Sequence, residues 1–268
     1  MRGPYFIRKN PGAIDPVAGS YRPFGGLLGI LVVFGFSLLP LIGGVGAAAA
    51  DTSSPVERVV PFVAYRLGNI APAYKGEYHS TRQGAFITDR HIYRTLAGVV
   101  VMEIESRFDQ VSGQSLTYSS LDYRTGRMEK VWRDQNALHY QLRRTHTGPL
   151  EEGVQEWVSA EFLWTDMLHI VSRLWLQLER GEVYPFKLFV PSRKTEYSLL
   201  LKKSRDSDSG RIRMEMSPDS AFLRLIVNPV TLVYAPGHPG QLLEYQGRSA
   251  LRDESGHLED LRIVMHPL

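Results

Sequence analysis

Cysteine is absent from all 268 residues of the chain. Without it the protein forms no disulfide and carries no lipid on an acylated cysteine, so an exported form has to be stabilised by a packed core. The 218 residues that follow residue 50 are enough to build such a core, because single β domains of this length are ordinary. Internal repeats are also absent, and we predict no second folded domain.

An excess of basic residues is missing from most of the chain. The formal charge of +3 belongs to the first 50 residues, and the remainder holds 27 Lys or Arg and 27 Asp or Glu. A nucleic-acid-binding domain carries its basic excess within the folded part. The composition therefore predicts no nucleic-acid partner, and we interpret Arg143-Arg144 and Lys202-Lys203 as solvated strand faces.

Motifs that dictate a chemistry are lacking as well. No Gly-rich phosphate loop or Gly-x-Ser-x-Gly element occurs, and the carboxylate pairs Glu151-Glu152 and Asp253-Glu254 lie beside glycine in predicted loops. We predict no catalytic residue, no metal and no cofactor. No two histidines have the i, i+4 spacing of a helical zinc site; the eight are His79, His91, His139, His146, His169, His238, His257 and His266.

The longest apolar run, Leu27 to Ala50, indicates where the protein goes. It follows a basic prefix and ends in an Ala-x-Ala cleavage pattern, as secretory signal peptides do. Its length also suffices to span a bilayer, for which about 20 apolar residues are needed, although Pro40 and the Gly- and Ala-rich second half favour cleavage near Ala50. We predict export to the periplasm, with residues 1–50 as a signal peptide or N-terminal membrane anchor and residues 27–50 forming the anchor.

Beyond this leader we predict a linker at residues 51–70, which contains Pro55 and Pro61, and a single β-rich envelope domain at residues 71–268. Short segments there alternate apolar and polar side chains between turns rich in Gly, Asn and Asp, which is typical of antiparallel strands. In one of them Met102 and Ile104 share a face opposite Glu103. The predicted strands are 99–108, 116–123, 128–133, 138–144, 182–190, 196–205, 211–216, 222–227, 230–234, 242–252 and 261–265.

One segment, Thr165 to Arg180, has the apolar spacing of an amphipathic helix instead. Thr165 or Asp166 can cap its start, and Gly181 is expected to end it. We therefore predict a mainly β fold: a curved antiparallel sheet, an incomplete barrel, wrapped over this one amphipathic α-helix.

The apolar face of the predicted helix allows two interpretations. It packs as ordinary core, or it lines an interior cavity that takes an acyl chain. In the second case the ligand-lining residues are Met167, Ile170, Val171, Leu174 and Trp175.

Residues 176–205 and 242–265 carry a resemblance. The helix end Arg180-Gly181, Lys194 with Tyr197, and the turn from Asp253 to Gly256 resemble exported proteins catalogued as domain of unknown function 3108, over residues 74–268. The chain departs from that family's Lys-x-Tyr-like element by one extra residue. The family is similar in outline to periplasmic lipoprotein carriers, half-barrels that close over a helix and hold acyl chains. The resemblance implies a lipid-handling or envelope role and transfers no functional residues.

These observations lead to one expected function and one main alternative; a second alternative is an enzyme whose site is assembled from polar residues far apart in the sequence. We expect a non-catalytic exported envelope protein that binds or shuttles a hydrophobic, lipid-like ligand. The main alternative is a structural or interaction module of an envelope complex, with a solid core, an envelope protein as partner and no ligand. In either case the N-terminal segment contacts the membrane if it is not cleaved.

Overall fold

The structure is a computed structural model that describes residues 55–134, 137–156, 162–163, 167–204, 210–237, 241–253 and 255–266. The predicted leader and the predicted helix caps Thr165 and Asp166 lie outside these ranges. The chain divides into two units, Met1–Ala49 and Ala50–Leu268, and the fold below is that of the second. Within the described residues, none of the helices combines the length and the hydrophobicity needed to cross a bilayer.

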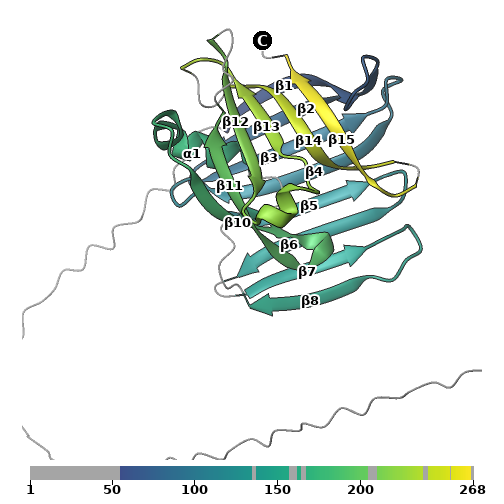
Figure 1. Ribbon diagram of the computed structural model, residues 1–268. Helices are drawn as coiled ribbons and strands as arrows, with labels where there is room; N and C mark the ends of the chain where they lie inside the picture. Colours follow the sequence, from purple (N-terminus) through teal and green to yellow (C-terminus); the bar gives the residue numbers. More distant parts are fainter. Residues whose placement is uncertain are drawn as a thin grey trace, which may run out of the picture. The chain divides into compact units, whose positions relative to one another are not determined.

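Fifteen strands of the described chain form a single sheet (Figure 1). Neighbours are antiparallel except for β9 and β10, which run parallel, and the order is β8-β7-β6-β5-β4-β3-β2-β1-β15-β14-β13-β12-β11-β10-β9. Since β8 and β9 stand at opposite ends of this order, the sheet is not closed into a barrel. The strands are β1 Val56–Arg66, β2 Pro72–Gln83, β3 Phe86–Arg94, β4 Val100–Asp109, β5 Ser115–Asp122, β6 Arg127–Asp134, β7 Ala137–Arg143, β8 Glu151–Glu156, β9 Phe162–Leu163, β10 Tyr184–Val190, β11 Thr195–Lys203, β12 Ile212–Pro218, β13 Val230–Tyr234, β14 Leu242–Arg252 and β15 Leu258–Met265.

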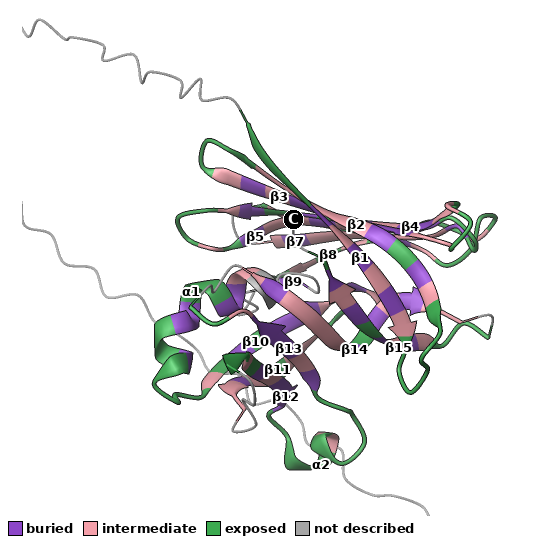
Figure 2. Ribbon diagram, turned by 90° about the horizontal axis from the view of Figure 1, so that it is seen from above, coloured by how far each residue is buried: buried purple, intermediate pink, exposed green. Residues whose placement is uncertain are grey.

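The sheet curves so that its two halves face one another (Figure 2). The 3₁₀-helix η1 (Pro191–Arg193) touches β6 and β7, and β9 touches β5, so the β9 end of the strand order lies against β5–β7 without a strand pair being formed there. Buried side chains from both halves, such as Phe62, Tyr118, Leu188 and Met214, form one core between them. The predicted fold class, a mainly β incomplete barrel with an amphipathic helix, is confirmed.

Helix α1 (Met167–Glu179) lies at one end of the folded sheet. It buries Ile170, Val171, Leu174, Trp175 and Leu178 in the core. Its end follows the predicted logic, because Gly181 adopts a left-handed conformation with φ 85°. The amide of Gly181 then donates to the Leu178 carbonyl (3.0 Å) and that of Glu182 to the Gln177 carbonyl (3.1 Å), which is a Schellman end.

The prediction of a linker at residues 51–70 is wrong for Val56–Arg66. This segment forms strand β1, which pairs with β2 on one side and with β15 on the other. Pro61 drew the prediction away from a strand, since proline lacks the N–H that an inner strand needs. Here its carbonyl accepts a hydrogen bond from the His266 amide (2.9 Å), and β15 ends one residue earlier at Met265. Pro61 therefore lies just beyond the last residue pair of β1 and β15, where its missing N–H costs no hydrogen bond between these strands.

The strand predicted at 222–227 is also wrong. A single helical turn, α2 (Ala221–Arg224), stands there, capped by the Ser220 hydroxyl, which accepts from the Leu223 amide (3.4 Å). The β-propensity of this apolar segment is overridden because its side chains cover no part of the core: Phe222 is 69% and Leu225 83% exposed. The remaining predicted strands each correspond to an observed one within a few residues.

Candidate functional site

A cavity of about 460 Å³ opens beside α1. Its walls come from β1, β2 and β3 in one half of the sheet, from β13, β14 and β15 in the other, and from α1. Binding sites for small molecules commonly have volumes of about 300–1,000 Å³, so the cavity can hold one. It is lined by Val56, Arg58, Val60, Tyr78, Ser80, Arg82, Ile87, His169, Ser172, Tyr234, Leu242 and Met265.

Strand geometry explains why β1 and β2 contribute alternate residues to this wall. Side chains two residues apart share one face of a strand, and residues paired across neighbouring strands share it too. The intervening residues face the other way, where Glu57 lies 3.1 Å from His79. The inward-facing pairs are Val56 with Arg82, Arg58 with Ser80, and Val60 with Tyr78.

The wall combines apolar side chains with positive charge. Val56, Val60, Ile87, Leu242 and Met265 supply the apolar part. Arginines on β1 and β2 supply the charge, and among the described residues that line the cavity there is no Asp or Glu. The site thus has the mixed character expected for a molecule with an apolar body and a polar end.

Tyr234 adds a buried hydrogen-bonding group to the wall. The residue is 1% exposed, and its hydroxyl has no hydrogen-bond partner within the described part of the chain. Burying a hydroxyl without a partner costs about 1–3 kcal/mol. The Tyr234 ring itself is held edge-on by Trp175 of α1, with ring centroids 5.5 Å apart.

A buried carboxylate orients the histidine that α1 presents to the cavity. Asp89 on β3 is 4% exposed, and its Oδ2 lies 2.8 Å from the Tyr78 hydroxyl and 2.6 Å from His169 Nε2. Burial by itself raises the pKa of Asp89, but the hydrogen bond and the charge of His169 outweigh it and the pKa is lowered. Asp89 is therefore ionised near neutral pH, so His169 Nε2 carries the proton and donates it.

His91 belongs to the same buried cluster. It lies across the β2–β3 pair from Tyr78, with ring centroids 4.9 Å apart. Burial lowers the pKa of His91 to about 4. The imidazole is therefore neutral at pH 7, and the ionised carboxylate nearby does not suffice to charge it.

The residues predicted to line a cavity are placed differently from the wall just described. Ile170, Val171, Leu174 and Trp175 pack in the core, each 6% exposed or less, while α1 turns His169 and Ser172 toward the cavity. The side chain of Met167 lies outside the described residues. Sequence reasoning missed the wall residues of β1 and β2, because polar residues such as Arg58 and Ser80 on the inward face interrupt the apolar alternation.

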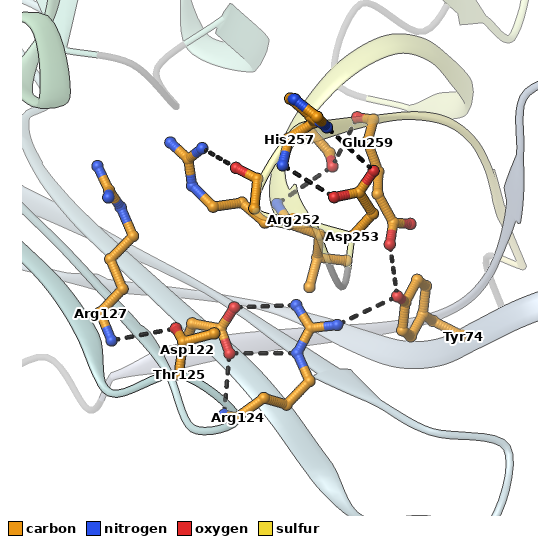
Figure 3. A network of polar contacts seen from close by, with 12 residues as sticks. Tyr74, Asp122, Arg124, Thr125, Arg127, Arg252, Asp253, His257 and Glu259 are labelled. Atoms are coloured by element: carbon orange, nitrogen blue, oxygen red, sulfur yellow. Dashed lines mark hydrogen bonds and ion pairs between the residues drawn. The ribbon is translucent and has the colours of Figure 1, made fainter. Parts of the chain in front are cut away.

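The opposite end of the folded sheet holds a polar network (Figure 3). Arg124, in the turn after β5, donates to both carboxylate oxygens of the buried Asp122 (2.9 and 3.2 Å) and to the Tyr74 hydroxyl (3.3 Å). The Tyr74 hydroxyl in turn donates to Glu259 on β15 (2.9 Å), and Arg66 lies 3.4 Å from the same carboxylate. These contacts fasten the β5–β6 turn and β2 to β15.

A small cavity of about 30 Å³ adjoins this network, between Asp122, Arg127 and Glu129 of one half and Ser192 and Arg252 of the other. That volume suits one or two water molecules. The network is therefore a structural fastening, and the cavity beside α1 is the better candidate for a functional site. Within the described ranges no three His, Asp or Glu residues are grouped so as to hold a metal ion.

The fold and its cavity define a mainly β protein with a half-barrel architecture. No family model and no curated protein matches the chain, and the resemblance to domain of unknown function 3108 stays a prediction. The chain is similar to a solved structure described as a beta-barrel-like protein of domain of unknown function 1849 from Brucella abortus, with 10% identity and a TM-score of 0.43, over 80% of this chain and 96% of that chain. A likeness at that level carries no functional argument.

Proposed function

We propose that the protein binds or shuttles a hydrophobic, lipid-like molecule in the cavity beside α1, without catalysis, in the cell envelope. The observation that carries the proposal is the cavity of about 460 Å³ with its largely apolar wall. Concave sites of this size with a mostly apolar lining are typical of small-molecule binding sites. A space of this size at the junction of both sheet halves and a helix is the feature expected of a binding protein.

The proposal includes a location. The apolar run from Leu27 to Ala50 would direct the chain to the periplasm, either as a cleaved signal peptide or as an inner-membrane anchor. A periplasmic location would give the cavity access to lipids or other hydrophobic molecules of the envelope.

Two tryptophan variants of α1 test the binding site. Ser172 lines the cavity and is exposed, so in Ser172→Trp we expect the indole to occupy its mouth and abolish co-purification of lipid. Leu176 lies one turn further along α1, is 71% exposed and is not among the lining residues, so Leu176→Trp is the matched control. Organic extracts of both variants and the parent are compared by mass spectrometry. Equal lipid content in all three would contradict binding in this cavity.

The alternative, an interaction module without a ligand, is favoured by one observation. The segment around α2 exposes four apolar side chains, those of Phe222, Leu225, Ile226 and Val227, and Figure 2 shows this turn in green, away from α1. Clustered apolar exposure of this kind is common at protein contact sites. The alternative predicts no lipid in any extract, so the same experiment separates the two functions.

A further inference from the structure

We propose that the cavity selects an amphipathic acid, whose carboxylate or phosphate group is held at the mouth by Arg58 and Arg82 while its apolar part lies inward. The inference rests on the proposed function and names the chemical class of its ligand. It is carried by the placement of charge and burial along the cavity.

The two arginines lie close together on the same face of the β1–β2 pair. Arg58 pairs with Ser80 and Arg82 with Val56, which makes the arginines diagonal neighbours. Diagonal neighbours on one face lie about 7–8 Å apart, within reach of long side chains. Long side chains at this residue spacing can both reach an anion placed between them. Arg also matches the planar geometry of carboxylate and phosphate oxygens.

Burial increases from the arginines inward. Both arginines and Val56 are exposed, whereas Val60 and Met265 are 4% and 8% exposed and Tyr234 is 1% exposed. The charged part of the wall is therefore at the mouth and the apolar part is inside. A molecule with an acidic head and an apolar body fits this order in one orientation only.

Neighbouring charges support the same orientation. The positive charge of Arg58 is close enough to Tyr78 to lower the pKa of that phenol, although burial and Asp89 raise it overall. Among the described residues no carboxylate forms an ion pair with Arg82. Deeper in the molecule the ionised Asp89 repels an anion, so the head group is held at the mouth rather than beside His169.

The test compares three probes with the same twelve-carbon chain: dodecanoic acid, dodecyl phosphate and dodecanol. Their dissociation constants are measured by calorimetry for the full-length protein and for the double variant Arg58→Gln/Arg82→Gln. The control is Arg90→Gln/Arg107→Gln, which removes the same charge from exposed residues on the other face of β3 and β4, where Arg90 pairs with Glu103 (2.8 Å).

We expect at least one acid to bind about tenfold or more tightly than dodecanol, because charge-assisted hydrogen bonds are stronger than neutral ones. The Arg58→Gln/Arg82→Gln variant should lose this preference and still bind dodecanol, while the Arg90→Gln/Arg107→Gln control should keep the preference. Preference for the acid or the phosphate identifies the head group. Equal binding of all three probes would overturn the inference and leave the proposed function standing. Failure of all three to bind would contradict both.

Discussion

Polar side chains on the inner face of β1, β2 and β3 give the cavity its chemical character. In an ordinary half-buried sheet the inward positions are apolar, but here they include Arg58, Ser80, Arg82 and Asp89. Asp89 Oδ2 is bonded by Tyr78 and His169, whereas Asp89 Oδ1 and the Tyr234 hydroxyl are left without a hydrogen-bond partner in the described structure. Unsatisfied buried polar atoms are uncommon in folded proteins, and each lowers the stability of the fold.

His91 predicts a pH dependence of stability. Its pKa is about 4 in the folded protein and 6.5 in the unfolded chain, so the unfolded state binds the proton first as the pH falls. Above pH 6.5 the residue contributes no pH dependence, and between pH 6.5 and 4 the protein should lose up to about 3 kcal/mol of unfolding free energy from this group. Urea unfolding at pH 7 and 4.5 measures the loss, and His91→Gln should remove most of it.

Asp89 acts over a lower pH range than His91. Because its pKa lies below the ordinary value of 3.8, its contribution is present above that value and is lost as the pH falls further. If His91→Gln lost as much unfolding free energy between pH 7 and 4.5 as the parent protein, a group other than His91 would be responsible for the loss.

At the scale of elements, the network around Tyr74 is expected to hold the β14–β15 hairpin against β2 and the β5–β6 turn. The Glu259 side chain is 4% exposed and accepts a hydrogen bond from the Tyr74 hydroxyl. Glu259→Gln should therefore lower the unfolding free energy by about 2 kcal/mol. The control is the next residue, Asp260, which pairs at 2.6 Å with Arg248 on the exposed face. Asp260→Asn should cost less than about 1 kcal/mol. Equal losses of unfolding free energy in the two variants, measured by urea unfolding, would mean that the network stabilises the fold no more than an exposed ion pair does.

Elements with strong periodicity could be predicted from the sequence. Helix α1 was expected at 165–180 and is observed at Met167–Glu179, because its apolar stripe and Gly181 are local signals. Strand β4 shows the expected two-residue alternation, with Met102 and Ile104 buried. At 222–227 an apolar sequence was mistaken for a strand, since apolar content alone does not show whether a partner strand is present.

The candidate site could not be predicted, for a physical reason. Strand β2 turns Gly76, Tyr78, Ser80 and Arg82 inward, so its buried face carries no hydrophobic pattern to recognise. Strand β1 was missed for another reason, because Pro61 argues against an inner strand. The residues that meet at the cavity come from seven elements spread between positions 56 and 265, and only the curvature of the sheet brings them together.

At the scale of the whole molecule, the unclosed sheet surrounds a packed core and leaves an open cavity at one end. The two halves meet along Phe62, Tyr118 and Leu188 and are fastened at one end by the Tyr74 network. At the other end α1 covers the opening with buried apolar residues, and the cavity lies between the helix and the strand ends. Helix α1 therefore both completes the core and forms one wall of the cavity.

Native mass spectrometry of the protein purified from an envelope fraction tests the central claim most directly. The gene is expressed with its own leader, so the measured mass also shows whether the first 50 residues are removed. We predict a stoichiometric adduct that is released by organic solvent and carries an acidic head group on an apolar body. A bare polypeptide mass under gentle ionisation, unchanged after incubation with dodecanoic acid or dodecyl phosphate, would contradict the account.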